Sequence, residues 1–201
     1  MVKVRVTKEE ADKLMNIKGN VTSSILKAGY QFILHEKGEK GIKTVEQRLK
    51  ELGYPLGFKE ISSFRWYPIS QACLFYLAAL DVFDWDESKA FDIGYNTPLY
   101  SILTKLLYRY FSLERMLREV PRYWLEHFDI GEVECVESNK NKRCAILRIK
   151  NFKKFHPILY IYMKGYITRV HEMAIKKKAV KVEQTKCIYN NDPYDEFKIT
   201  W

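Results

Sequence analysis

The stretch EVECVESNKNKRCAILRI, residues 132–149, decides the fold class of this sequence. Residues 132–136 and 143–149 are rich in β-branched and other apolar side chains, and the polar residues 138–142 separate them. Two β-rich runs joined by a short polar segment are typical of a β-hairpin. The sequence therefore predicts two neighbouring antiparallel strands here.

A helix and a second hairpin are predicted after this first hairpin. Pro157 can open a helix that continues to about Ala174, because proline fits the first helical turn. Strands at 179–189 and 194–201 follow, and the polar residues 190–193 form the turn between them. Hairpin, helix and hairpin together predict a four-stranded antiparallel sheet.

The residues before the first hairpin are predicted to form a helical layer. Apolar side chains recur there at intervals of three and four, with Ser, Thr, Asp, Pro and Gly at the expected starts and stops. The predicted helices cover 20–36, 44–52, 68–80, 84–94, 97–110 and 112–120, and the charged residues 35–41 are predicted to be a loop. The fold class is therefore α+β, in a single domain of residues 1–201 with a helical part at about 1–128 and a sheet-plus-helix part at about 130–201.

The composition is that of an ordinary globular protein. The chain has 201 residues, of which 47% are hydrophobic and 29% charged, and these values exclude disordered and fibrous classes. The longest apolar run, 72–80, is too short for the ~18 residues of a membrane span, and the first residues lack the apolar run of a signal peptide. The four cysteines form no Cys-x-x-Cys pair. We therefore expect a cytoplasmic protein with reduced thiols and no membrane span.

Several short motifs near the end of the sequence occur in a particular order. Tyr162-Met-Lys-Gly165 lies in the predicted helix, Cys187 precedes the turn Asn190-Asn-Asp192, and Phe197-Lys-Ile-Thr-Trp201 closes the last strand. With these motifs the chain resembles the superfamily of 4-vinyl-reductase, heme-nitric-oxide-binding and TRAPP-like ligand-binding domains. The resemblance is loose over most of the chain and more specific over 157–201. It implies helices and hairpins packed around an apolar ligand pocket.

The resemblance also implies cofactor ligands, and this sequence departs from them. Heme-binding members carry an axial histidine in the helix before the sheet and a Tyr-x-Ser-x-Arg motif. Here 113–118 contains no histidine, 146–150 lacks the motif, and His127 is the nearest substitute. Relatives with a zinc or redox site close the last hairpin with two cysteines, whereas this chain has Cys187 and then Asp195. Heme and zinc are therefore disfavoured, and the cofactor is left open.

Other candidate sites have simpler interpretations. The four histidines show no ligand spacing, and the sequence has no nucleophile motif or glycine-rich phosphate loop. The acidic residues between Asp81 and Glu87 could hold a cation, but helix capping explains them more simply. No catalytic residue and no metal ligand is therefore nominated, and a binding role is favoured over an enzymatic one.

The aromatic residues between 64 and 128 are the basis for a predicted ligand pocket. Rings at helical spacing usually fill a core, but Tyr and Trp also need partners for their polar atoms. Combined with the resemblance, this favours a sensing, signalling or carrier domain that binds an apolar small molecule and changes conformation on binding. A protein partner or self-association would read that change. The predicted pocket residues are Trp66, Cys73, Tyr76, Leu77, Leu103, Leu107, Tyr108, Phe111 and Trp124.

A basic region supports a second hypothesis, in which the chain binds nucleic acid or another anion. Residues 140–186 hold 14 Lys and Arg against two acids, within a chain of net charge +9. A lysine-coated, solvated sheet edge is the simpler alternative. A third hypothesis, a reductase-like enzyme, rests on the resemblance alone. The candidate anion-binding residues are Lys140, Lys142, Arg143, Lys153, Lys154, Lys176, Lys177 and Lys178.

Overall fold

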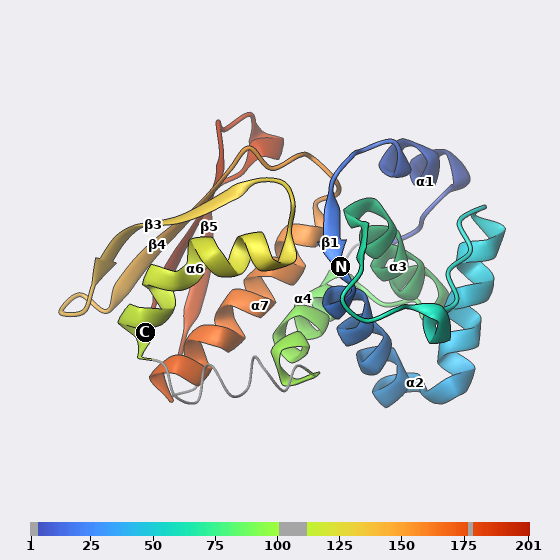
Figure 1. Cartoon of the computed structure of the whole chain (residues 1–201), viewed down its shortest axis with the longest axis horizontal. Helices are drawn as coiled ribbons and strands as arrows, with labels where there is room; N and C mark the ends of the chain where they lie inside the picture. The colour runs from blue at the N-terminus through green and yellow to red at the C-terminus, as the bar shows by residue number, and fades with distance from the viewer. Residues whose placement is uncertain (1–3, 101–111, 177–178) are drawn as a thin grey trace.

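The computed structural model describes residues 4–100, 112–176 and 179–201 (Figure 1). Its first part is a helical layer that holds a two-stranded antiparallel ribbon, β1–β2. The elements of this part are α1 (Lys8–Met15), β1 (Asn20–Thr22), α2 (Ser23–Glu51), η1 (Phe58–Glu60), β2 (Trp66–Pro68), α3 (Ile69–Val82), α4 (Glu87–Asn96) and η2 (Thr97–Tyr100).

The second part is a four-stranded antiparallel sheet with two helices. Its elements are α6 (Leu113–His127), β3 (Glu132–Asn139), β4 (Cys144–Lys150), α7 (Ile158–Ile175), β5 (Lys181–Lys186), η3 (Ile188–Asn190) and β6 (Asp195–Thr200). The strand order is β3-β4-β6-β5, so the last strand in the sequence lies inside the sheet. The predicted α+β class, with helices first and then hairpin, helix and hairpin, is confirmed.

The two faces of the sheet differ in polarity. The inner face carries buried apolar side chains such as Leu147 and Phe197, which are register partners on β4 and β6. α6 packs against β3 and α7 against β5, so these helices cover that face. On the outer face, Arg148 Nη2 lies 2.8 Å from Glu196 Oε2. Lys150 Nζ lies 2.6 Å from Glu134 Oε1. The outer face therefore carries both acidic and basic side chains, which pair with one another.

α7 lies between the sheet and α4 (Figure 1), and its contact with α4 is made backbone to backbone. A methyl group placed on Gly94 would overlap the carbonyl oxygen of Tyr162, and one placed on Gly165 would overlap that of Phe91. Two glycines facing opposite helices allow this approach because neither carries a side chain. We call this backbone contact between α4 and α7, at Gly94 and Gly165, the glycine seam. It joins the helical layer to the part of the fold that contains the sheet.

The N-terminal segment is tied to α2 and α3 through Asp81. The Asp81 side chain is 7% exposed, with Oδ1 2.9 Å from Arg5 Nη1 and Oδ2 2.9 Å from Arg48 Nη2. Arg48 Nη2 also donates to the carbonyl of Val6 over 2.7 Å. Burial by itself would raise the pKa of Asp81, but the two guanidinium groups outweigh burial and the pKa is lowered. These ion pairs therefore hold the N-terminal segment and α2 against the C-terminal end of α3. We call them the clamp at Asp81.

Some predicted boundaries are wrong, and each error has a local cause. α2 runs from Ser23 to Glu51 with a kink at Gly38, where φ is 65° and ψ −171°. The expected loop at 35–41 is therefore helical except for this kink, and Thr44 is inside the helix instead of capping it. Its Oγ1 hydrogen-bonds to the carbonyl of Lys40, four residues earlier.

Three further boundaries differ from expectation. Residues 20–22 form β1 and not the start of a helix, because they pair with β2. Asp86, and not Asp84, caps α4, since its Oδ1 accepts from the backbone N–H of Ser88. The helix that begins after Ser112 was expected to kink or end near Pro121, and it continues through Pro121 to His127. In the described part of the chain, no helix is long and apolar enough to span a membrane.

Candidate functional site

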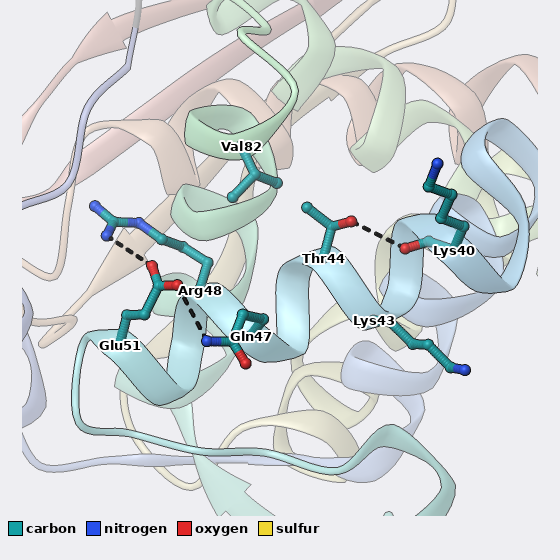
Figure 2. A pocket seen from close by; sticks show the side chains of 7 residues that line it. All are labelled: Lys40, Lys43, Thr44, Gln47, Arg48, Glu51 and Val82. Carbon is teal, nitrogen blue, oxygen red and sulfur yellow. Dashed lines mark hydrogen bonds and ion pairs between the residues drawn. The ribbon is translucent and has the colours of Figure 1, made fainter.

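One hollow of the surface lies along α2 and has a volume of about 360 Å³ (Figure 2). Its lining side chains extend from the outer side of the helix, and Val82 of α3 is the apolar residue among them. Several bond to one another, as Arg48 Nη1 does to Glu51 Oε2 over 3.4 Å. This hollow is therefore a polar groove on the surface. It is lined by Lys40, Lys43, Thr44, Gln47, Arg48, Glu51 and Val82.

A second hollow, of about 250 Å³, lies between α6 and β3. Its apolar side is formed by Pro121, Trp124, Leu125 and Val133, and its rim by Glu132, Glu134 and Lys150. Trp124 is fixed there, because its indole Nε1 donates to the carbonyl of Ile130 over 3.0 Å. Its ring stacks on Phe128 with a centroid distance of 4.3 Å. This predicted pocket residue therefore belongs to a surface cleft.

The remaining predicted pocket residues do not lie together. Cys73, Tyr76 and Leu77 are buried on α3. Tyr76 stacks on Tyr162 of α7 at 5.1 Å and donates to the carbonyl of Ile25 over 3.1 Å. Trp66 is 47% exposed on β2. Leu103, Leu107, Tyr108 and Phe111 lie outside the described residues. Among the residues predicted to line the pocket, only the α3 group is therefore seen inside the protein.

The interior does contain a polar cluster, between α7 and the β5–β6 hairpin. Asp195, at the start of β6, is fully buried. Its Oδ1 accepts from the backbone N–H of Ile188 over 3.0 Å and from Gln184 Nε2 over 3.2 Å. Its Oδ2 and the buried hydroxyl of Tyr160 on α7 have no hydrogen-bond partner in the described structure. The Tyr160 and Asp195 side chains lie close enough to interact with each other, so the two atoms lack a well-formed hydrogen bond but are not isolated.

Aromatic and thiol side chains surround these two atoms. The Tyr160 ring packs edge-on against Tyr189 of η3 at 5.8 Å. Cys187 of the same hairpin and Cys73 of α3 are near enough to Tyr189 to contribute to its raised pKa, behind the larger effect of burial. Tyr189 and Cys187 are half-buried, so they separate the cluster from solvent. We call Cys73, Tyr160, Cys187, Tyr189 and Asp195 the hairpin cluster.

Burial sets the protonation of the hairpin cluster. It raises the pKa of the Asp195 carboxyl, and the hydrogen bond from Ile188 and the nearby Tyr160, Cys187 and Gln184 only partly oppose it. Burial and the adjacent Asp195 also raise the pKa of Tyr160. A neutral phenol and a carboxyl with a raised pKa can both accept or donate hydrogen bonds. The cluster can therefore hold a polar group, or exchange a proton with it, away from water.

Sequence reasoning noticed Asp195 only as the position of an absent cysteine, and it missed Tyr160. A signal for Asp195 was present in the sequence. Alternate residues of a strand share one face, so Asp195 shares its face with Phe197 and Ile199, which are buried. A carboxyl on an apolar face needs a partner or a function. Tyr160 had no comparable signal among the many aromatic residues of the chain.

Solved structures of H-NOX proteins share this architecture. An H-NOX protein from S. oneidensis in the Fe(II)NO ligation state matches with a TM-score of 0.64 and 10% identity, over 89% of this chain and 97% of that chain. An oxygen-binding H-NOX domain related to soluble guanylate cyclases matches at 0.62 and 12%, over 89% and 92%. The unliganded Fe(II) H-NOX protein from K. algicida matches at 0.56 and 11%, over 89% and 95%. This chain has the H-NOX fold.

The likeness to H-NOX proteins is one of structure. No protein-family model and no curated protein matches the sequence. At 10–12% identity the comparison establishes the fold and leaves the ligand open. The heme-nitric-oxide-binding part of the predicted resemblance is therefore confirmed at the level of the fold. The 4-vinyl-reductase and TRAPP-like parts stay predictions.

The H-NOX fold raises the question of whether these residues fit a heme. The histidine of α6 is His127, in the last turn, and its Nδ1 lies 2.9 Å from the carbonyl of Tyr123. In β4, Arg148 pairs with Glu196 on the outer face of the sheet. α4 and α7 are in direct backbone contact at Gly94 and Gly165, which leaves no room for a heme between the two helices at that point. A heme held by an axial histidine of α6 and a Tyr-x-Ser-x-Arg motif does not fit these residues.

The basic residues of the H-NOX-like sheet fall into separate groups. Lys140, Lys142 and Arg143 lie at the tip of the β3–β4 hairpin, and Lys153 and Lys154 follow the other end of β4. Lys176 ends α7, and Lys177 and Lys178 lie outside the described residues. Acids from neighbouring strands pair with several cations of this region. Anion binding by residues 140–186 stays a prediction.

His171 of α7 provides a prediction about acid stability. It is buried, its Nδ1 lies 2.8 Å from the carbonyl of Ile167, and its Nε2 has no partner in the described structure. Burial lowers its pKa to about 4. Because the unfolded chain takes up this proton near pH 6.5, the contribution of His171 to stability should be constant above pH 6.5 and fall by about 3 kcal/mol between pH 6.5 and pH 4.

Urea unfolding of the wild type and of His171→Leu over this pH range tests the prediction. The variant should lose the part of the pH dependence that is due to His171, whereas His35→Gln, at an exposed position, should keep it. The pKa of His156 is also lowered by burial, and its contribution remains in both variants. If His171→Leu does not fold, imidazole NMR of the wild type reads the pKa directly. A His171 pKa near 6.5 would contradict the prediction.

Proposed function

We propose that this protein binds a small molecule with an apolar body and one polar group at the hairpin cluster. The observation that carries the proposal is the buried pair Asp195 Oδ2 and Tyr160 Oη, which lie near each other and have no well-formed hydrogen bond. Leaving such atoms unpaired costs free energy, and a ligand that bonds to both recovers it. The surrounding rings and thiols would contact the apolar body. A hydroxyl, amide or amine is the polar group that this pair would accept.

The location agrees with the predicted role as a sensing or carrier domain. The hairpin cluster brings together α3 of the helical layer, α7 and the β5–β6 hairpin, so a ligand there would contact both parts of the fold. To admit a ligand, the η3 turn that carries Tyr189 would move away from Tyr160. This movement would couple binding to the conformation of the hairpin. A protein partner, or a second copy of the chain, would then recognise that conformation.

The structural neighbours support the general class of function. Their names describe H-NOX proteins in an Fe(II)NO state and in an oxygen complex, so this fold holds small ligands in those proteins. The present chain combines the fold with a different set of interior side chains. Binding of an apolar molecule without a heme is the function that this combination favours.

Titration with the fluorescent dye N-phenyl-1-naphthylamine tests the proposal, because the dye is apolar and carries one N–H donor. The wild type should bind it with saturation. Asp195→Asn should weaken binding about tenfold, because the dye N–H loses its carboxyl acceptor. Tyr160→Phe should weaken it less, because the single N–H cannot donate fully to both oxygens. Lys198→Ala, on the exposed outer face of the same strand, should bind as the wild type does.

Native mass spectrometry of the purified full chain provides a second measurement. A co-purified mass that disappears in Asp195→Asn would support the proposal and would begin to identify the ligand. The proposal would be contradicted if the dye bound Asp195→Asn, Tyr160→Phe and the wild type equally. It would also be contradicted if the wild type showed neither saturable dye binding nor a co-purified mass.

A further inference from the structure

The turn between η1 and β2, in the connection between α2 and α3 (Figure 1), presents aromatic side chains to solvent. Phe64 is 98% exposed and Trp66 is 47% exposed. In the described part of the chain, only Leu125 and Val136 are other large apolar side chains with comparable exposure. Two exposed rings within three residues are unusual for a turn, because exposed aromatic side chains gain nothing from water.

The backbone holds Phe64 in this position against its own preference. Its φ is +62°, in the left-handed region, where a bulky side chain is strained. The residues around it are fixed: Ser23 N–H donates to the carbonyl of Arg65 over 2.8 Å, and Ser62 N–H donates to the hydroxyl of Tyr67 over 3.0 Å. Strain that the neighbouring structure maintains is typical of functional positions. These hydrogen bonds therefore fix the backbone of the turn in the conformation that exposes the Phe64 side chain.

Two basic side chains, Arg65 and Lys27, lie at this turn. Arg65 lies between Phe64 and Trp66 and is exposed. Lys27 of α2 reaches the turn, where its Nζ donates to Ser63 Oγ over 2.6 Å. The nearest acid along the chain, Glu60, precedes Phe64 by four residues. The whole chain carries a net charge of +9. A partner with a negative surface and an apolar interior would complement this combination of groups.

We propose that the turn at residues 62–66 docks this protein on the surface of a bilayer that contains anionic phospholipid. Phe64 inserts among the acyl chains, Trp66 lies at the level of the headgroups, and Arg65 and Lys27 contact phosphate groups. Tryptophan prefers the membrane–water interface, and basic side chains are attracted to anionic leaflets. The proposal is independent of the ligand proposed for the hairpin cluster.

A bilayer fits this turn better than a protein partner does. A stable protein interface buries about 800 Å² on each side and has an apolar core. The turn offers two exposed rings, and Leu125 and Val136, the other exposed apolar side chains of the described chain, lie on α6 and β3. A bilayer needs no matching groove, since a single projecting ring can enter it.

Co-sedimentation of the full chain with phosphatidylcholine vesicles, with and without phosphatidylserine, tests the proposal. The wild type should bind the vesicles that contain phosphatidylserine, and high salt should weaken binding. Phe64→Asn should reduce the partition coefficient at least about tenfold. Arg65→Ala should reduce it about fivefold. Phe64→Asn should fold without loss of melting temperature, because asparagine adopts the left-handed conformation more easily.

Leu125→Asn is the matched control, because Leu125 is 63% exposed and lies on α6. This variant should partition as the wild type does. Three results would each overturn the proposal: no binding of the wild type to phosphatidylserine vesicles at low salt, unchanged binding of Phe64→Asn, or equal losses in Phe64→Asn and Leu125→Asn. Dye binding at the hairpin cluster should be the same in all three proteins, which separates this test from the previous one.

Discussion

Gly165→Ala is expected to destabilise the protein by about 4 kcal/mol. In an ordinary helix the same substitution is stabilising by about 0.5–1 kcal/mol, so the sign of the change is informative. Here the new methyl would overlap the backbone carbonyl of Phe91 on α4. One extra methyl in a tight core costs about 1–3 kcal/mol when side chains can move, and backbone moves less easily. α4 and α7 would therefore have to separate.

Urea unfolding of Gly165→Ala measures this effect, with Glu87→Ala on the exposed surface of α4 as a control. Gly94→Ala should destabilise in the same way, because its methyl would meet the carbonyl of Tyr162. The two changes act at one seam, so their effects should not add in the double variant. A neutral or stabilising Gly165→Ala would show that the two helices are not in backbone contact.

Asp81→Ala is expected to reduce stability by about 3–4 kcal/mol. Removing one partner of a buried ion pair costs about 3–5 kcal/mol when the other charge is left uncompensated, and among the described acids Arg48 would keep only the longer contact with Glu51. The Asp81 side chain is 7% exposed and holds Arg48, whose side chain is 28% exposed, as well as the more exposed Arg5. The change would also release the segment around Val6, since the Arg48 guanidinium that binds its carbonyl would no longer be fixed.

Thermal and urea unfolding of Asp81→Ala should be compared with Asp84→Asn, which removes the charge and keeps a side chain that tolerates the left-handed backbone of this position, φ 53°. Asp84 is 48% exposed and lies 3.2 Å from Arg5. Exposed pairs contribute about 0–1 kcal/mol, so the control should change little. Equal, small losses in both variants would mean that the clamp at Asp81 behaves as a surface ion pair.

The architecture was predictable because its decisive signals are local. Both hairpins of the sheet combine β-rich runs with polar turns, and α7 begins after a proline. The kink at Gly38 was not predictable, because a glycine among charged residues is also typical of a loop. The β1–β2 ribbon was missed because its strands have three residues each and depend on pairing between distant residues, such as Val21 and Tyr67, which are 46 positions apart. Strands this short carry no periodicity that a sequence pattern can reveal.

The site was less predictable than the fold. A helical face can be assigned to the interior from its spacing, and Cys73, Tyr76 and Leu77 are indeed buried. Spacing cannot show which interior residues lie near residues of a distant hairpin, as Tyr160 and Tyr189 do. It also cannot separate a ring in the core from one held outward by a strained backbone, as Phe64 is. Those distinctions depend on tertiary contacts.

The inner position of β6 has a consequence for how the protein forms during translation. β6 lies between β4 and β5, yet it is the last of these strands to be synthesised. β3 and β4 can pair on the ribosome, whereas β5 has no neighbour until β6 emerges. During that interval the nascent chain carries an unpaired strand, an open edge of β4 and part of α7 uncovered. A ribosome-bound chain paused just after β5 is therefore the species in which we expect the strongest association with chaperones.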